Sequence, residues 1–276
     1  MTDNNKQSRV LVNVLGIPLL LSAIYFGGIY FQCLIFIAIF ISTFEFYSIC
    51  LKKDIGIQII SIFLFYIYLF LTYFIESIFI NIEILFLMII FLLLIELFRN
   101  KSKPIENIGI TIFGIVWIGL FMNYIVLIRN IPEQGMLLTF VMFLSVWICD
   151  TSAFFFGSKF GEKKILPKIS PNKTWFGTIS GFIAVLIFNF ILFKFNVLYQ
   201  ENYNFTIFDV LNFSIIFGLI GQLGDFLESM IKREMNVKDS GTILRGHGGI
   251  LDRMDSLILV APCYYIYLKF IMSING

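Results

Sequence analysis

The sequence is poor in charge. Only 14% of its 276 residues are Asp, Glu, Lys or Arg, whereas 59% are hydrophobic. A soluble globular domain carries about 25% charged residues. A core cannot absorb the apolar excess, because even large folded proteins leave much of their surface in water. The composition excludes a soluble enzyme, a secreted disulfide scaffold and a disordered tail, and it predicts an all-α polytopic membrane protein.

Further absences narrow the function. The formal net charge is only +2, which indicates no nucleic-acid partner. The four cysteines form no CxxC pair and lie in or beside apolar runs, so we expect packing residues rather than a disulfide or a zinc site. The sequence also shows no repeat that would indicate the inverted halves of a transporter.

Long apolar stretches dominate what is present. A spanning helix needs about 20 mainly apolar residues. Nine stretches approach that length, at roughly residues 10–27, 29–50, 57–75, 78–98, 108–128, 136–157, 176–198, 207–224 and 254–272. A second stretch follows the first at once, so the first is interpreted as a retained anchor rather than a cleaved signal peptide.

Basic residues are distributed asymmetrically. If the N-terminus lies in the cytoplasm, 17 of the 20 Lys and Arg residues fall in cytoplasmic segments, which favours this threading. Two long polar loops, residues 158–175 and 225–253, then lie on the same side. We therefore separate N-terminal transmembrane helices (residues 1–107) from a C-terminal catalytic region (residues 108–276) with its site at the cytoplasmic face.

The densest polar stretch begins at Asp225. Glu228, Ser229 and Lys232 follow it at helical spacing, so the four side chains share one helix face. Ordinary amphipathicity also produces such a pattern. The residues that follow therefore decide how the stretch is interpreted.

A glycine-rich loop (residues 246–249) and two further carboxylates, Asp252 and Asp255, complete this region. Glycine backbone amides can approach a phosphate closely. Carboxylates at a membrane boundary are costly unless a positive group holds them. Pairing with Lys232 and Arg253 is one interpretation. The arrangement favours a second, in which the three aspartates around the loop bind a hard cation such as Mg²⁺.

Single residues in both loops are further candidates. The only histidine, His247, lies between glycines, so we expect it to contact substrate or phosphate, with packing inside the loop as the alternative. Asp150 lies at or near the end of an apolar stretch, and an acid at that depth is a functional candidate. Lys173 lies in a Ser-Pro-Asn-Lys-Thr turn that begins at Ser170.

The loop around Lys173 is basic. Residues 158–174 contain five lysines and one glutamate, a charge suited to gathering anionic ligands or lipids. Lysines in such a loop also fix membrane topology. We favour that role for Lys159, Lys163 and Lys164, and a phosphate contact for Lys173.

At this point the sequence resembles a known signature, that of the phosphatidate cytidylyltransferases, or CDP-diacylglycerol synthases. The resemblance rests on the pattern Ser-x2-Lys-Arg-x4-Lys-Asp-x-Gly-x4-Gly-His-Gly-Gly-x-Leu-Asp-Arg-x-Asp over residues 229–255. It extends back through Gly224-Asp225, Ser-Pro-x-Lys-Thr-Trp over residues 170–175, and Asp-x2-Ala-x3-Gly over residues 150–157. The first half of the chain is similar only in hydrophobic pattern.

The sequence departs from the family pattern at two positions. Phe176 stands where the family usually has Glu, which puts any role of that acid in doubt here. Arg245 stands where the family usually has Pro, and it adds a positive charge beside the glycine loop.

The resemblance implies transfer of CMP from CTP to phosphatidic acid, giving CDP-diacylglycerol and pyrophosphate for phospholipid synthesis at the inner face of a bacterial-type cytoplasmic membrane. Mg²⁺ is expected at Asp225, Asp252 and Asp255, with a second cation left open. Lys173 is a further catalytic candidate, and so is Asp150, which by the resemblance either binds metal or orients Lys173. The substrate-binding candidates are Ser170, Lys173, Glu228, Ser229, Lys232, Arg233, Lys238, Asp239, His247, Gly248, Gly249 and Arg253. A homodimer is also left open.

Two alternatives remain. A CTP-dependent lipid kinase would also need CTP and metal, but it would transfer the γ-phosphoryl group; the long signature disfavours it. A cation-coupled transporter would place charges along successive spans, whereas only Glu45, Glu83 and Glu96 look intramembrane here.

Overall fold

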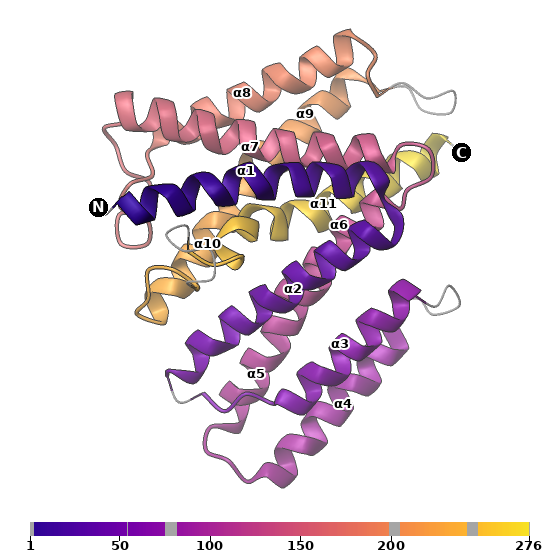
Figure 1. Ribbon diagram of the computed structural model, residues 1–276, viewed down its shortest axis with the longest axis vertical. Coiled ribbons are helices and arrows are strands. Elements are labelled where there is room, and N and C mark those ends of the chain that lie inside the picture. The colour runs from indigo at the N-terminus through magenta and orange to yellow at the C-terminus, as the bar shows by residue number, and fades with distance from the viewer. Residues whose placement is uncertain (1–2, 54, 75–81, 199–204, 242–247, 276) are drawn as a thin grey trace.

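The computed structural model describes residues 3–53, 55–74, 82–198, 205–241 and 248–275, which are mainly helical (Figure 1). The helices are α1 (Asp3–Phe26), α2 (Gly28–Leu51), α3 (Ile59–Phe74), α4 (Ile82–Arg99), α5 (Pro104–Gly114), α6 (Phe121–Arg129), α7 (Gly135–Phe160), α8 (Trp175–Lys194), α9 (Ile207–Ile215), α10 (Gly221–Glu234) and α11 (Leu251–Asn275). Two π-helical segments, η1 (Ile115–Leu120) and η2 (Ile216–Ile220), join α5 to α6 and α9 to α10.

These elements confirm the all-α polytopic prediction. Because α5–η1–α6 and α9–η2–α10 each run on without a break, the described residues form nine continuous helical segments. Six of these segments are long and apolar enough to cross a membrane, and shorter apolar helices lie at Val14–Phe26 and Ile59–Tyr73. The division of the chain at residue 107 stays a prediction, and α5 crosses that position.

Two helices extend beyond the apolar stretches that predicted them. The segment that begins at Ile207 continues to Glu234, and the last helix begins at Leu251. Apolar composition marks the part of a helix in lipid, whereas backbone hydrogen bonding continues into the polar zone. Asp225 therefore lies inside the helical segment that ends at Glu234, and Asp252 lies in the first turn of α11.

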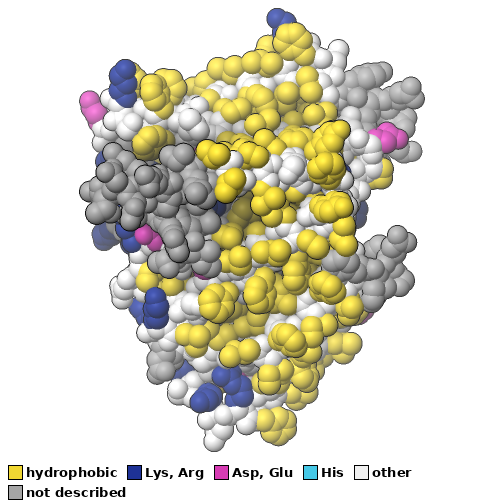
Figure 2. Space-filling model, in the orientation of Figure 1, with side chains coloured by type: hydrophobic (Ala, Val, Ile, Leu, Met, Phe, Trp, Pro, Cys, Tyr) yellow, Lys and Arg dark blue, Asp and Glu magenta, His cyan; other side chains and the backbone are white. Residues whose placement is uncertain are grey.

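The polar connections gather on one side of the molecule. In Figure 1 the N-terminus and the connections that follow α2, α4, α7 and α10 lie to the left and lower left, and the C-terminus lies to the right. Figure 2 shows a broad hydrophobic surface in the same view, with Lys and Arg side chains mainly toward its left and lower edges. The shared side of these loops agrees with the threading proposed from charge, and their cytoplasmic location stays a prediction.

Glycines bring α7 and α8 close together. A Cβ atom on Gly177 would lie 2.7 Å from the carbonyl oxygen of Ala153 and 3.0 Å from the Cα atom of Gly157. One turn further along α8, a Cβ atom on Gly181 would lie 2.9 Å from the carbonyl oxygen of Cys149. Small residues allow this approach between membrane helices. Ala153 and Gly157 of the signature therefore set the packing beside Asp150.

A glycine also sets the contact between α10 and α11. A Cβ atom on Gly224 would lie 2.5 Å from the carbonyl oxygen of Asp255 and 3.1 Å from the Cα atom of Ser256. The two backbones can approach this closely only because residue 224 has no side chain. The consequence is that Asp225, the next residue, lies beside the first turns of α11.

A polar cluster joins the segment just before α3 to the helices α4 and α5. Glu96 is only 4% exposed, and its carboxylate accepts hydrogen bonds from Gln58 (2.7 Å), Asn107 (2.8 Å) and Arg99 (2.8 Å). Asn107 in turn accepts from the backbone N–H of Gly56 at 2.7 Å. We call these five residues the Glu96 cluster.

Candidate active site

A cavity of about 590 Å³ lies between α7, the connection to α8, α10 and α11. We call it the polar cavity. Six of the predicted site residues line it, namely Asp150, Lys173, Asp225, Asp252, Arg253 and Asp255. Trp147, Ala153 and Phe154 form an apolar part of its wall on α7. The polar cavity therefore joins charged groups to an apolar surface.

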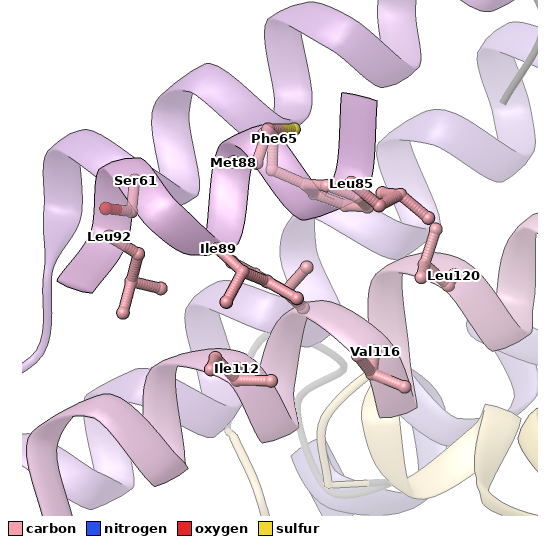
Figure 3. A pocket seen from close by; sticks show the side chains of 10 residues that line it. Ser61, Phe65, Leu85, Met88, Ile89, Leu92, Ile112, Val116 and Leu120 are labelled. Carbon is pink, nitrogen blue, oxygen red and sulfur yellow. The ribbon is translucent and has the colours of Figure 1, made fainter. Parts of the chain in front are cut away.

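A second cavity of about 100 Å³ lies between α3, α4 and the α5–η1 segment (Figure 3). Leu85, Met88, Ile89 and Leu92 point into it from α4, and its one polar lining side chain is Ser61. No ionisable side chain is among the described residues that line it. Acid, base or phosphate chemistry therefore belongs to the polar cavity.

Lys173 is held in the polar cavity from two directions. Its ammonium group forms an ion pair with Asp225 and lies 4.4 Å from the centroid of the Phe226 ring. The next residue, Thr174, caps α8 by accepting a hydrogen bond from the backbone N–H of Gly177 at 3.1 Å. The pairing partner of Lys173 is thus Asp225, which the sequence did not indicate.

An antiparallel bridge orders the segment that carries Lys173. Lys164 and Thr174 pair across it, and the backbone N–H of Ile165 donates to the carbonyl of Lys173 at 3.2 Å. Lys163 is exposed and takes part through its carbonyl, which accepts from the N–H of Trp175 at 3.0 Å. This geometry separates the Lys173 side chain, inside the cavity, from that of Lys163, on the surface.

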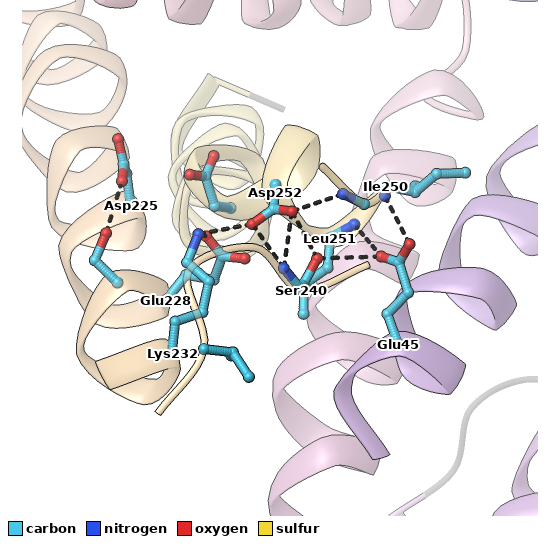
Figure 4. Close-up of polar contacts among 12 residues, drawn as sticks. Glu45, Asp225, Glu228, Lys232, Ser240, Ile250, Leu251 and Asp252 are labelled. Atoms are coloured by element: carbon cyan, nitrogen blue, oxygen red, sulfur yellow. Dashed lines mark hydrogen bonds and ion pairs between the residues drawn. The ribbon is translucent and has the colours of Figure 1, made fainter. Parts of the chain in front are cut away.

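Lys232 joins α10 to α11. Its ammonium group lies 2.7 Å from the carboxylates of both Glu228 and Asp252, and all three side chains are nearly buried (Figure 4). Asp252 also accepts from the N–H and hydroxyl of Ser240 (3.0 and 2.9 Å) and from the N–H of Gly249 (2.6 Å). For Asp252 the ion-pairing interpretation is therefore realised in the structure.

Three other carboxylates share the polar cavity. Asp150, Asp225 and Asp255 line it from α7, α10 and α11, close enough that negative charge on one disfavours negative charge on the others. Asp255 accepts a hydrogen bond from the backbone N–H of Ser256 at 2.6 Å. Groups of like charge converge here from three helices, which is typical of a site that receives a cation or a cationic group.

The donor set suits a hard divalent cation. Within the described part of the chain, no three His, Cys, Asp or Glu side chains are close enough to enclose a metal ion by themselves. Mg²⁺ does not require such a cage, because it is usually bound by one or two carboxylates together with water and substrate phosphates. Carboxylates beside an open cavity therefore fit Mg²⁺ accompanied by a phosphate ligand.

Several predicted binding residues lie beside the polar cavity rather than in its lining. Ser229 donates to Asp225 at 3.3 Å, and the Arg233 guanidinium donates to the carbonyl of Ile169 at 3.2 Å, which ties the Lys173 loop to α10. Ser170 lies in that loop, whereas Lys238 and Asp239 are exposed after α10. Gly248 and Gly249 lie against Asp252 and Glu45, respectively. His247 and Arg245 fall outside the described residues.

Sequence reasoning missed two residues that contact this site. Gln222 lines the polar cavity and donates to the carbonyls of Gly218 (2.6 Å) and Thr178 (3.1 Å). Glu45 of α2 accepts hydrogen bonds from the start of α11 (Figure 4). A buried acid in an otherwise apolar stretch was the available signal for Glu45, but its partner lies too far along the sequence to be found from spacing.

Comparisons with known proteins agree with the geometry. The model of the cytidylyltransferase family matches residues 7–271. Phosphatidate cytidylyltransferase of Bacillus subtilis is 37% identical over 163 residues, which cover 59% of each chain. The Haemophilus influenzae enzyme of that name is 41% identical over 143 residues, covering 51% of this chain and 49% of its own. That of Staphylococcus haemolyticus is 41% identical over 157 residues, covering 57% of each. The matched segment thus spans about half to three fifths of these curated relatives.

Proposed function

The chain belongs to the cytidylyltransferase family, and from this premise we propose that it transfers CMP from CTP to phosphatidic acid. The products are CDP-diacylglycerol and pyrophosphate, which makes the protein an enzyme of phospholipid synthesis. The observation that carries the proposal is the polar cavity, where Asp150, Lys173, Asp225 and Asp255 meet beside an apolar wall.

The two surfaces of the polar cavity suit a substrate that is itself amphipathic. Phosphatidic acid has an anionic phosphate attached to apolar chains. Lys173 and Arg253 supply positive charge at the cavity lining, and Trp147 and Phe154 supply apolar surface on α7. A phosphate near Lys173 would gain a charge-assisted hydrogen bond, the stronger class of hydrogen bond in proteins.

Within this proposal Mg²⁺ is held by Asp225 and Asp255, with Asp150 close by. When bound, the ion would neutralise phosphate charge and hold the triphosphate in place. Asp252 as a third ligand and a second cation both remain predictions. The contacts of Asp252 with Lys232, Ser240 and Gly249 suit it to fix the segment before α11.

The reaction needs little acid–base chemistry from the protein. An anionic oxygen of the phosphatidic acid phosphate forms a bond to the α-phosphorus of CTP, and the bond from that phosphorus to the bridging oxygen breaks. The electron pair leaves with pyrophosphate. The nucleophile already carries negative charge, so positioning and charge neutralisation are the main requirements. Lys173 and the aspartates provide both without a Ser–His or Cys–His pair.

The proposed location follows from the substrates. CTP is a cytoplasmic nucleotide, and the basic connection between α7 and α8 lines part of the polar cavity through Lys164 and Lys173. We therefore place the cavity at the cytoplasmic face of a bacterial-type membrane, in accord with the positive-inside rule. A homodimer stays open, as it did from the sequence.

Labelled CTP tests the reaction directly. Purified protein is incubated with phosphatidic acid vesicles, Mg²⁺ and CTP labelled at either the α or the γ phosphorus. We expect the α label in the lipid and the γ label in pyrophosphate. Entry of the γ label into lipid would instead identify a CTP-dependent lipid kinase. Absence of CTP turnover would overturn the proposed reaction and favour the transporter alternative.

A further inference from the structure

Glu45 is a buried carboxylate of the N-terminal region that contacts the C-terminal region. It lies on α2, is 3% exposed, and is surrounded in sequence by apolar residues. Its two oxygens accept hydrogen bonds from the backbone N–H groups of Ile250 (3.2 Å) and Leu251 (2.9 Å), and it lies 3.3 Å from the hydroxyl of Ser240 (Figure 4). Ser240 and Ile250 precede α11, and Leu251 is its first residue.

These contacts satisfy donors that α11 cannot satisfy itself. The first N–H groups of a helix have no partner within the helix and are usually capped by a preceding Ser, Thr, Asp or Asn. Here the residue before Leu251 is Ile250, whose side chain has no acceptor. Glu45 supplies the acceptor from 205 residues away in sequence, and its negative charge suits the positive end of the helix.

Two glycines of the signature make room for Glu45. A Cβ atom on Gly241 would lie 2.2 Å from one carboxylate oxygen, and a Cβ atom on Gly249 would lie 2.2 Å from the other. Any side chain at either position would displace the carboxylate. Thus Gly249, which lies in the loop assigned to phosphate approach, also serves a contact with α2, and Gly241 of the signature serves the same contact.

We propose that Glu45 is a positioning residue for the reaction: by capping α11 from α2, it sets the place of Asp252 and Asp255. Asp252 shares the Ser240 hydroxyl with Glu45, and Asp255 follows one turn later on α11. The inference rests on the proposed function and gives the N-terminal helices a role in it. Without the cap, the first turn of α11 would lose its hold on α2.

Glu45→Gln tests this inference, with Glu96→Gln as the matched control. Glutamine keeps the size of the side chain but replaces one acceptor oxygen with an N–H donor, which would face the donors of Ile250 or Leu251. Glu96 is equally buried in the N-terminal region, and its partners belong to the Glu96 cluster. Both variants replace a buried carboxylate with an amide, but only residue 45 contacts the start of α11.

Hydrogen–deuterium exchange provides a readout independent of activity. We expect amide exchange in residues 248–252 to rise about tenfold or more in Glu45→Gln and to stay unchanged in Glu96→Gln. The KM for CTP should rise about 10- to 100-fold in Glu45→Gln, with a smaller change in kcat. Glu96→Gln should lower the Tm but leave the amide exchange of residues 248–252 and the KM for CTP unchanged.

The possible failures are distinguishable. Absence of CTP turnover by the wild type would refute the proposed function. If the wild type turns over CTP normally, and both variants keep the wild-type amide exchange and the wild-type KM for CTP, only the role of Glu45 is refuted. If Glu45→Gln cannot be purified, Glu45→Asp replaces it, because aspartate keeps the charge but is one methylene too short to reach both N–H groups. Wild-type exchange and KM in Glu45→Asp would also overturn the inference.

Discussion

Both regions of the chain contain carboxylates shielded from solvent, but the groups around those carboxylates differ. In the Glu96 cluster of the N-terminal region, one carboxylate receives hydrogen bonds from three side chains, including a guanidinium. In the polar cavity of the C-terminal region, Asp150, Asp225 and Asp255 line one shared cavity from three helices. In the first arrangement the protein itself supplies hydrogen-bond donors for the carboxylate, whereas the second arrangement keeps carboxylates available to a cation or substrate.

Whether the protein itself satisfies a carboxylate distinguishes a structural acid from a functional one better than the burial of that carboxylate does. Glu96 is almost fully buried, and its carboxylate is held by side chains of the Glu96 cluster. Its burial therefore reflects a structural role. Asp225 keeps about 30% of its side chain exposed although it pairs with Lys173. Repulsion between like charges costs stability, and such costs are retained mainly where function requires them. The comparison predicts that neutralising an acid has opposite consequences in the two regions.

The largest expected effect is that of Asp255→Asn. We expect kcat/KM to fall more than about a hundredfold, because a charged ligand of the proposed cation is lost. The Tm should be unchanged or higher, because a carboxyl group whose charge is disfavoured by its acidic neighbours is replaced by a neutral amide. Turnover over a Mg²⁺ titration, together with thermal unfolding, measures both. Glu106→Gln, at an exposed carboxylate of α5, is the control and should leave both unchanged. Near-normal turnover with an unchanged Mg²⁺ dependence would remove Asp255 from the metal site.

The next effect concerns Lys173 and its neighbour in the same loop. Lys173→Ala removes the ammonium group from the polar cavity, and a charge-assisted contact is worth about 1.5–3 kcal/mol. This corresponds to a loss of about 10- to 100-fold in rate. Lys163→Ala removes an exposed ammonium group and should change the rate little. Steady-state kinetics of the two variants compares them, and equal small losses would reduce Lys173 to a topology determinant.

Asp252→Asn should lower stability, as a change in the Glu96 cluster would, although Asp252 lines the polar cavity. The substitution weakens the contact with Lys232, which is 11% exposed, and leaves that lysine with Glu228 alone. We expect a loss of about 1–3 kcal/mol in the free energy of unfolding. Thermal or denaturant unfolding beside Asp255→Asn measures the difference. If Asp252→Asn keeps the wild-type stability but shifts the Mg²⁺ dependence, Asp252 belongs with the metal ligands.

Much of this organisation was predictable from sequence. Apolar length predicted the nine helical segments, and helical spacing put Asp225, Glu228 and Ser229 on one helix. Spacing could not show that α10 and α11 meet at Gly224, because that contact depends on the packing of two helices. The pairs Lys173–Asp225 and Lys232–Asp252 follow from such packing.

Glu45 shows the limit more clearly. As an isolated acid in an apolar stretch it was noticeable, and it fitted a transporter as readily as an enzyme. Its partners, Ile250 and Leu251, contribute only backbone N–H groups, which leave no mark in a sequence. Only the approach of α2 to the start of α11 identifies it as a cap.

The smallest expected effect comes from restoring the family's acid at Phe176. Phe176 is 48% exposed and contacts the Phe160 ring, with the centroids 5.8 Å apart. It is absent from the described lining of the polar cavity. Phe176→Glu exchanges an apolar contact on the outside of α7 and α8 for a charge, so we expect kcat/KM to stay within about threefold of the wild type, a change of under about 0.7 kcal/mol. Phe176→Leu, which keeps the position apolar, is the matched control. A large gain in turnover for the glutamate variant alone would show that position 176 belongs with the carboxylates of the polar cavity.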